Sequence, residues 1–327
     1  MKTRITVIGD GGWGTALAMV LAENGHDVTV WGPFEEYIQE IRSSGENHRF
    51  LPGAPLPDTI TWTSDREQAV ADTHHYVLAM PTKYFRTIME SFAPLVPAGA
   101  HMVSVAKGFD LETRERMTTI ANDIFTGAHV AALSGPSHAE EVARGQPTAV
   151  VLASDEAPEM LQALFTNRMF RVYTTDDVIG VELGGALKNV VAVAAGICDG
   201  IGFGDNTRAA LITRGLAEMT RFGMAMGAKE KTFSGLSGMG DLIVTCGSQH
   251  SRNRSAGERI GRGEALEDIM GSQQAVEGIW NCQIVNAIAR DKGIDTPITD
   301  EVYAVVHQGK DPREAVTSLL SREYRPE

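Results

Sequence analysis

The sequence has little cysteine, and what it has is not arranged for a metal or a disulfide framework. Its three cysteines, Cys198, Cys246 and Cys282, are odd in number and share no metal-like spacing. We therefore predict no metal site and a reducing, cytoplasmic compartment.

Positive charge is also scarce. Lysine and arginine number 29 against 42 acidic residues, which gives a net charge of −13. Nucleic acids and anionic membranes bind basic surfaces, so this balance argues against both as partners. An anionic substrate would need a local cationic pocket.

Segments that direct a chain to or through a membrane are missing from the pattern. The N-terminus enters a strand pattern at once, without the basic and apolar regions of a signal peptide. The apolar run at 183–197 is short, interrupted by glycine, and contains Lys188. We expect no membrane insertion.

Short apolar runs alternate with helical patterns over the first 175 or so residues, and only helical patterns follow. Such alternation predicts a parallel, doubly wound α/β sheet of the Rossmann type. We predict a dinucleotide-binding Rossmann-like domain at 1–177 and an all-α substrate-binding and catalytic domain at 178–327. The long, turn-rich loop at 43–58 suggests a functional loop. Strands are predicted at 4–9, 27–31, 59–62, 75–80, 101–106, 128–133, 148–154 and 168–174.

A glycine-rich motif at 9–14, Gly-Asp-Gly-Gly-Trp-Gly, follows the first predicted strand and opens a helix. In this context Gly9 allows a tight turn, Gly11 lets a pyrophosphate approach the backbone, and Gly14 lets the helix pack on the strand. The motif favours a bound NAD or NADP over a glycine turn without ligand.

The end of the second strand bears on the choice between NAD and NADP. An acid there binds the ribose hydroxyls of NAD, whereas a nearby arginine accommodates the phosphate of NADP. Residues 27–41 contain no basic side chain, and Glu35 and Glu36 stand at about the right distance, although acids also suit a helix start. We favour NAD without excluding NADP, and expect an arginine at position 32 to improve the use of NADPH.

Lys188 lies in an apolar helical pattern, where an ammonium is costly unless it is paired or deprotonated. It is either a general acid and base, oriented by Asp241 and assisted by Asn189, or a structural lysine that reaches the surface or pairs with Glu182. A second cluster, Ser251-Arg252-Asn253-Arg254, is either a phosphate clamp or a solvated helix start.

Several segments together resemble NAD(P)-dependent glycerol-3-phosphate dehydrogenases of the bacterial type. The similarity covers nearly the whole chain and implies reversible reduction of dihydroxyacetone phosphate to sn-glycerol 3-phosphate for glycerophospholipid synthesis. By analogy, it also implies a homodimer through the helical domain. The segments are GDGGWGTALA, ENHRFLPG, SVAKGFD, LSGPSHAEEV, VELGGALKNVVAVAAGICDGIGFGDNTRAAL, GLSGMGDLIVTC and SRNRSAGERIG.

The resemblance implies a role for each matching residue. Lys188 would be the catalytic proton donor and acceptor. Substrate contacts would come from Lys107, Gly135, Ser137, Lys188, Asn189, Asp241, Ser251, Arg252 and Asn253. Cofactor contacts would come from Gly9, Gly11, Gly12, Trp13, Gly14, Lys107, Ala139, Arg252 and Glu277.

Two departures concern the cofactor. Asp10 stands where family members often have alanine, and Gly32-Pro33 stands where they often have a basic residue. The residues also leave two rival functions open: another two-domain hydroxyacid or sugar-acid dehydrogenase, and a nucleotide-sensing regulator without catalysis.

Overall fold

The computed structural model describes residues 2–271 and 276–322, which divide into two compact units. The first unit takes in the chain up to Ala106 together with Glu115–Glu182, and the second takes in Lys107–Arg114 and the chain from Leu183 onward. This differs from the predicted division at 177 and 178. Glu182, in the first turns of helix α8, accepts hydrogen bonds from the amide and hydroxyl of Thr118, so the start of α8 belongs with the first unit.

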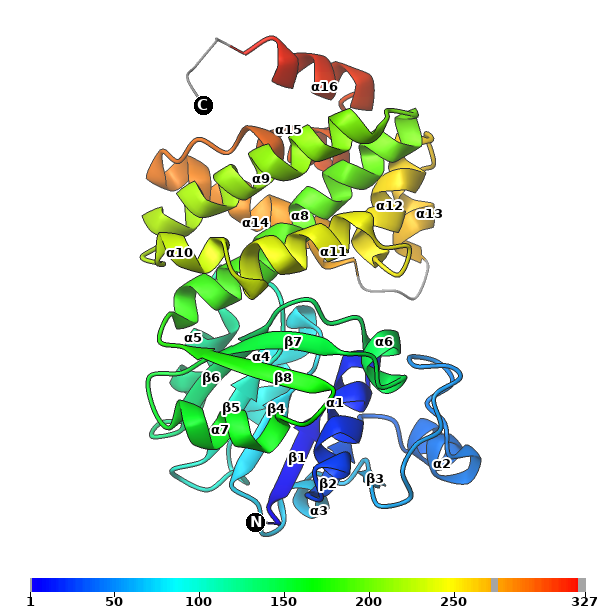
Figure 1. The fold of residues 1–327 in the computed structure, drawn as a ribbon, viewed down its shortest axis with the longest axis vertical. Helices are drawn as coiled ribbons and strands as arrows, with labels where there is room; N and C mark the ends of the chain where they lie inside the picture. The colour runs from blue at the N-terminus through cyan, green and yellow to red at the C-terminus, as the bar shows by residue number, and fades with distance from the viewer. Residues whose placement is uncertain (1, 272–275, 323–327) are drawn as a thin grey trace. The chain divides into compact units, whose positions relative to one another are not determined.

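The first unit is an eight-stranded sheet with helices between its strands (Figure 1). The strand order is β3-β2-β1-β4-β5-β6-β7-β8. The strands are β1 (Arg4–Ile8), β2 (Asp27–Trp31), β3 (Thr61–Thr63), β4 (His75–Leu78), β5 (His101–Ser104), β6 (His129–Ser134), β7 (Thr148–Ala153) and β8 (Phe170–Thr175). The helices are α1 (Gly12–Glu23), α2 (Glu35–Ser44), α3 (Arg66–Val70), α4 (Thr82–Phe92), α5 (Met117–Ile124), α6 (Ala139–Ala143) and α7 (Pro158–Phe165).

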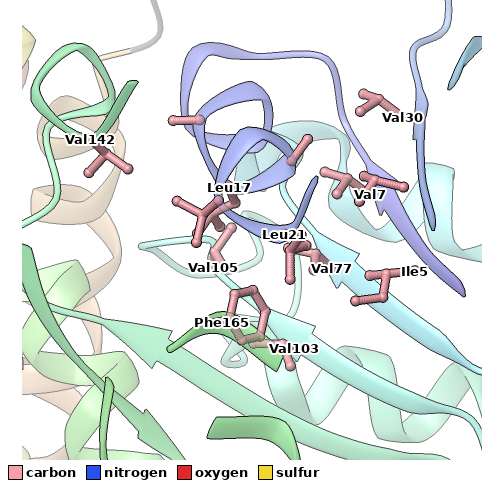
Figure 2. Packing of buried hydrophobic residues seen from close by; sticks show 14 of the residues in the cluster. Ile5, Val7, Leu17, Leu21, Val30, Val77, Val103, Val105, Val142 and Phe165 are labelled. Atoms are coloured by element: carbon pink, nitrogen blue, oxygen red, sulfur yellow. The ribbon is translucent and has the colours of Figure 1, made fainter. Parts of the chain in front are cut away.

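Side chains along each strand point alternately to the two faces of the sheet. Helices cover both faces, so both are buried. Val7, Val77 and Val103 join one apolar cluster with α1, α2 and α7, while Tyr76 and Met102 join a second cluster with α4 and α5. Figure 2 shows Leu17 and Leu21 of α1 within the first cluster. Helices on both faces confirm the predicted Rossmann-type fold class.

The sheet is not parallel throughout, which corrects the prediction from the sequence. Strands β1 to β6 run parallel, but β7 pairs with β6 in the antiparallel direction, and β8 is parallel to β7. Between β6 and β7 lies only the five-residue helix α6. The chain reverses direction within this connection, so β7 lies antiparallel beside β6.

The second unit is helical in its described part. Its helices are α8 (Val178–Ile201), α9 (Asp205–Ala225), α10 (Glu230–Phe233), α11 (Asp241–Gly247), α12 (Arg252–Gly261), α13 (Leu266–Gly271), α14 (Glu277–Lys292), α15 (Pro297–Gln308) and α16 (Pro312–Leu320), with a single π-helical stretch, η1 (Leu236–Gly240).

Helix α8 is long and apolar enough to span a bilayer by length and composition alone, but 89% of its most apolar window is buried inside the protein. It is therefore the central helix of a folded unit. Glycines let its neighbours approach closely: a Cβ on Gly196 would lie 1.9 Å from the carbonyl oxygen of Arg254 in α12, and one on Gly257 of α12 would lie 2.1 Å from that of Val193. Only glycine permits such backbone contact.

Candidate active site

The glycine turn between β1 and α1 closes tightly. Gly9 has a φ of +124°, which favours glycine, and a Cβ there would lie 2.6 Å from the carbonyl oxygen of Ala79. A Cβ on Gly14 would lie 2.3 Å from the carbonyl oxygen of Gly9. Only glycine therefore fits at positions 9 and 14.

This turn has the shape and polarity that a dinucleotide pyrophosphate needs. Gly11 is the N-cap of α1, and, apart from Gly11 and its two chain neighbours, no described residue has an atom within 4 Å of the position that its Cβ would take. Gly12 is covered by the carbonyl oxygen of Phe50, 2.4 Å from a Cβ placed there, with the side chain of Ala139 at 3.7 Å. The first-turn amides of α1 are thus accessible on the side of Gly11. A helix N-terminus favours the binding of phosphate at such a place. The indole Nε1 of Trp13 is buried and has no hydrogen-bond partner among the described residues.

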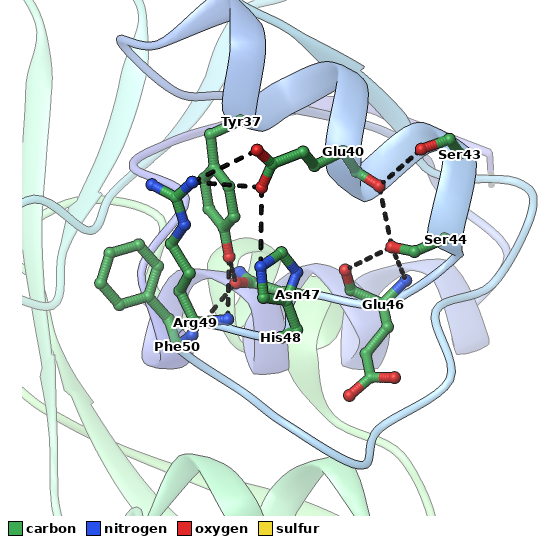
Figure 3. Close-up of polar contacts among 9 residues, drawn as sticks. All are labelled: Tyr37, Glu40, Ser43, Ser44, Glu46, Asn47, His48, Arg49 and Phe50. Atoms are coloured by element: carbon green, nitrogen blue, oxygen red, sulfur yellow. Dashed lines mark hydrogen bonds and ion pairs between the residues drawn. The ribbon is translucent and has the colours of Figure 1, made fainter.

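The loop after α2 packs against the glycine turn. Asn47 donates from Nδ2 to the carbonyl oxygen of Asp10 and to the hydroxyl of Thr15, both at 2.7 Å. The hydroxyl of Tyr37 donates to Asn47 Oδ1, and the Arg49 guanidinium lies 4.1 Å from the Tyr37 ring centre (Figure 3). The sequence predicted a functional loop here from the loop's length and its turn-forming residues. It gave no reason to select Asn47 or Arg49.

Asp10 itself has an unusual environment. Its side chain is 9% exposed, and Oδ2 has no hydrogen-bond partner among the described residues. Burial raises the pKa of this carboxyl above its ordinary value, and a hydrogen bond to the Asp10 backbone and the charge of Arg49 only partly offset that effect. A Cβ on Gly32 would lie 2.4 Å from Oδ2, so the carboxylate fills the space of a side chain at position 32.

This contact bears on the expectation about an arginine at position 32, which stays a prediction. A Gly32→Arg side chain would meet the Asp10 carboxylate at once, so the single change must displace Asp10 before it can help NADPH. Glu35 is held by other contacts: it accepts hydrogen bonds from Ser64 and from Gln39, in the first turn of α2. That supports the helix-start interpretation of Glu35.

The remaining candidates of the first unit lie on the turn between β6 and α6. Gly135 has a φ of +139°, and its carbonyl oxygen accepts a hydrogen bond of 2.8 Å from the Ser137 hydroxyl. Ala139 begins α6 two residues later, beside Gly12 as described above.

In the second unit, Lys188 lies at the centre of a buried polar network. Its Nζ donates to Asp241 Oδ1 at 2.7 Å and to the Thr245 hydroxyl at 2.6 Å. Lys107 Nζ donates to the other oxygen of Asp241, at 2.7 Å. One carboxylate thus holds two ammonium groups. The structural alternative for Lys188 is wrong in both forms: Lys188 is only 7% exposed, and Glu182 pairs with Arg116 instead.

The network shifts the pKa values of its members in opposite directions. Burial lowers the pKa of Lys188 from 10.5 to about 8; the Asp241 carboxylate opposes that change, and the charge of Lys107 adds to it. Burial alone would raise the pKa of Asp241, but the two lysines outweigh it and hold the pKa below its ordinary value. Lys188 can therefore exchange a proton near neutral pH, while Asp241 stays ionised.

Asparagines connect this network to α12 and α14. Asn253 donates to Asn189 Oδ1 at 2.9 Å and accepts from the amide of Gly278 at 2.8 Å. The carbonyl oxygen of Lys107 accepts from Asn189 at 3.4 Å and from Asn281 at 3.3 Å. These contacts explain why Lys107 groups with the helical unit although it follows β5 in sequence.

The Ser251–Arg254 cluster divides into two parts. Ser251 is the N-cap of α12, and its hydroxyl accepts from the amide of Arg254 at 3.2 Å. Arg254 forms an ion pair of 2.6 Å with Asp199, so it is not available to a phosphate. Arg252 is exposed and has no ion-pair partner among the residues that the structure describes. Glu277 begins α14, next to the Gly278 amide that Asn253 binds.

Sequence reasoning missed Thr245 and Asn281. Thr245 lies four residues after Asp241 in α11, a spacing that places both on one helix face and could have found it. Nothing local pointed to Asn281. Across residues 2–271 and 276–322, no three His, Cys, Asp or Glu side chains gather in a metal-like group.

A glycine turn that opens α1 of a Rossmann-type sheet, and a buried lysine in a helical unit, together define the class of two-domain nicotinamide-dependent dehydrogenases. Within this class the chain belongs to the NAD-dependent glycerol-3-phosphate dehydrogenase family. The model of the family's N-terminus matches residues 4–160, and that of its C-terminus matches residues 177–317.

Known glycerol-3-phosphate dehydrogenases are similar to this chain over nearly its whole length. Glycerol-3-phosphate dehydrogenase (NAD(P)+) of Bacillus cytotoxicus is 47% identical over 326 residues, which cover 98% of this chain and 96% of that relative. The crystal structure of glycerol-3-phosphate dehydrogenase from Coxiella burnetii is 38% identical with a TM-score of 0.95, covering 98% and 99% of the two chains. The Saccharomyces cerevisiae enzyme is 27% identical with a TM-score of 0.85, covering 98% and 100%. The resemblance found in the sequence is confirmed, and with it the class of NAD(P)-dependent oxidoreductase.

Proposed function

We propose that this chain catalyses the reaction for which its family is named, the reversible reduction of dihydroxyacetone phosphate at its C2 carbonyl to sn-glycerol 3-phosphate. The proposal is carried by one observation above all: a buried lysine, 7% exposed, is hydrogen-bonded to an aspartate that a second lysine also binds. Burial lowers the pKa of this lysine to about 8.

When bound, the nicotinamide ring supplies or accepts the hydride. Lys188 moves the proton. As an ammonium it donates to the oxygen that becomes the C2 hydroxyl and stabilises the negative charge that develops there. In the reverse direction the neutral amine accepts the hydroxyl proton.

Asp241 and Lys107 set the proton affinity of Lys188. The carboxylate orients the amine and favours its charged form, and the Lys107 ammonium opposes that form by repulsion. With Asp241 ionised and Lys107 protonated, the three groups carry a net charge of +1 when Lys188 is protonated and zero when it is not. The protonated state therefore suits an anionic substrate.

The start of α12 is the proposed phosphate-binding element. Arg252 offers a guanidinium suited to phosphate oxygens, and Ser251 and Asn253 lie on either side of it in sequence. A local cation is needed here because the chain as a whole carries a charge of −13.

The test is a pair of pH profiles. NADH oxidation with dihydroxyacetone phosphate should fall as the pH rises through about 8, because the ammonium form of Lys188 is lost. Oxidation of sn-glycerol 3-phosphate with NAD⁺ should rise over the same range. Reduction of a hydroxyacid precursor in preference to dihydroxyacetone phosphate would instead support a related dehydrogenase. NADH binding without any turnover would support a nucleotide sensor.

We also propose that the protein works in the cytoplasm as a homodimer and does not insert into membranes. Burial of α8 and a net negative charge support the absence of membrane insertion, and the homodimer is proposed by analogy with the family. Sedimentation equilibrium of the purified protein without detergent tests the dimer.

A further inference from the structure

Asp10 is a position in the glycine turn that the dinucleotide fingerprint does not explain. An anion beside a pyrophosphate site is unfavourable, and burying an unpaired carboxylate is costly. Yet Asp10 is 9% exposed and Oδ2 has no hydrogen-bond partner among the described residues. Buried polar groups are usually hydrogen-bonded, so a carboxylate with an unpartnered oxygen is suited to a ligand that donates hydrogen bonds to it.

The position of the carboxylate indicates that ligand. Gly32 directly follows β2, the strand end where dinucleotide enzymes place the acid that binds the adenosine ribose. A Cβ on Gly32 would lie 2.4 Å from Asp10 Oδ2, 2.6 Å from Cγ and 2.9 Å from Cβ of the same residue. The carboxylate from the glycine turn therefore occupies the space where a side chain at position 32 would begin.

The backbone of Asp10 is fixed in a way that keeps the side chain there. Its carbonyl oxygen accepts a hydrogen bond of 2.7 Å from Asn47, whose amide also binds Thr15 in α1. The loop after α2 thus holds the backbone of Asp10 at the start of α1, from where its side chain reaches Gly32.

We propose that Asp10 accepts hydrogen bonds from the hydroxyls of the adenosine ribose and excludes a 2′-phosphate, so that this chain selects NADH over NADPH. In other dinucleotide enzymes, an acid at the end of the second strand usually binds this ribose. Here Asp10, which lies in the glycine turn, would bind it instead. The inference rests on the proposed use of a nicotinamide dinucleotide but not on the identity of the substrate.

Arg49 is the nearby cation that could favour the opposite choice. Its guanidinium stands over the Tyr37 ring and forms an ion pair of 3.1 Å with Glu40 (Figure 3). Its charge acts on Asp10 and stabilises the carboxylate. While Asp10 is ionised, its carboxylate would repel a 2′-phosphate. When Asp10 is neutral, only the attraction of Arg49 for that phosphate remains.

Direct binding measures the effect without turnover. NADH and NADPH are titrated separately into the wild-type protein and into D10N, D10A and E35Q, by calorimetry. The wild type should bind NADH at least about tenfold more tightly than NADPH, and D10N and D10A should lose about tenfold or more in NADH affinity, the usual effect of losing hydrogen bonds to a charged group. NADPH should bind these two variants more tightly than it binds the wild type. E35Q should keep the wild-type ratio, because Glu35 is held by Ser64 and Gln39.

Two further variants test the contact with Gly32. G32R alone should weaken both cofactors, since the new side chain meets Asp10, whereas the double variant D10A/G32R should bind NADPH more tightly than either single variant. Thermal melting of each variant checks its fold.

An unchanged ratio of NADH to NADPH affinity in folded D10N and D10A would overturn the inference, as would a shift in E35Q alone. Turnover of dihydroxyacetone phosphate is measured separately. Its absence, with the Asp10 effect intact, would refute the proposed reaction and leave the role of Asp10 standing.

Discussion

Two buried aspartates next to glycine-rich segments, Asp10 and Asp241, differ in what surrounds them. Asp241 follows the π-helical stretch η1, is 1% exposed, and binds two lysines through its two oxygens. Asp10 follows Gly9, is 9% exposed, and has one oxygen without a partner among the described residues. The pKa of Asp241 lies below its ordinary value, and that of Asp10 lies above it.

The difference shows that burial by itself does not decide what a carboxylate does. Burial raises the pKa in both cases, and only the neighbouring ammonium groups reverse the direction at Asp241. A carboxylate that is already paired positions its partners. A carboxylate with an unpartnered oxygen is suited to receive hydrogen bonds from a ligand.

The largest effect is expected from removing the central amine. Lys188→Ala should lower kcat by about 10²- to 10⁴-fold, the usual contribution of a general acid or base. It would also leave Asp241 with Lys107 alone, closer to the situation of Asp10. Steady-state kinetics measures the loss, and calorimetry should show NADH affinity close to wild type. Lys292→Ala, at the exposed end of α14, is the matched control. Turnover of the Lys188 variant at the wild-type rate would remove Lys188 from the mechanism.

Replacing the paired carboxylate should have the next largest effect. Asp241→Asn leaves the buried Lys188 ammonium and the partly buried Lys107 ammonium without their counter-charge, which should lower the free energy of unfolding by about 3–5 kcal/mol. It should also lower the pKa of Lys188 below about 8, because the Asp241 charge is what raises it. The pH profile of ketone reduction should then fall at lower pH than in the wild type. Asp10→Asn should leave the midpoint of that profile where it is. Equal shifts in the two variants would abolish the distinction between the two aspartates.

A smaller effect is expected at the start of α12. Arg252→Ala should raise the KM for dihydroxyacetone phosphate by about 10- to 100-fold, with a smaller change in kcat, because it removes charge-assisted hydrogen bonds to phosphate. Arg262→Ala, at the other end of α12 and paired with Glu258, serves as the control. If both variants keep the wild-type KM, Arg252 does not bind the phosphate.

The smallest effect concerns the packing of η1, the stretch that directly precedes Asp241. A Cβ on Gly184 of α8 would lie 2.5 Å from the carbonyl oxygen of Ser237 in η1. Gly184→Ala should therefore push this stretch away and lower the free energy of unfolding by about 1–3 kcal/mol in a urea titration. Gly247→Ala, where no described atom lies within 4 Å of the added Cβ, should cost nothing. Equal stability of the two variants would mean that η1 moves freely.

Much of the fold could be predicted from local pattern. Apolar strands that alternate with helical segments imply a doubly wound sheet, and the glycine motif in its strand-turn-helix context implies a dinucleotide site. The direction of β7 could not be predicted, because it depends on a long-range pairing between Leu133 and Leu152 that leaves no periodic trace in either strand. The family segments pointed to Lys107, Lys188 and Asp241, but not to Thr245 or to the asparagine contacts between them.

The sequence by itself determined the class of fold, the family, and the presence of a lysine in a helix too apolar to expose it. Only the tertiary structure decided which carboxylate meets that lysine, since Asp241 lies 53 residues further along the chain while Glu182, six residues before it, binds Arg116. It also decided that Asp10 lies against Gly32 and not toward solvent. Local spacing fixes which residues share a helix face or a turn, whereas contacts between distant segments depend on how the whole unit packs.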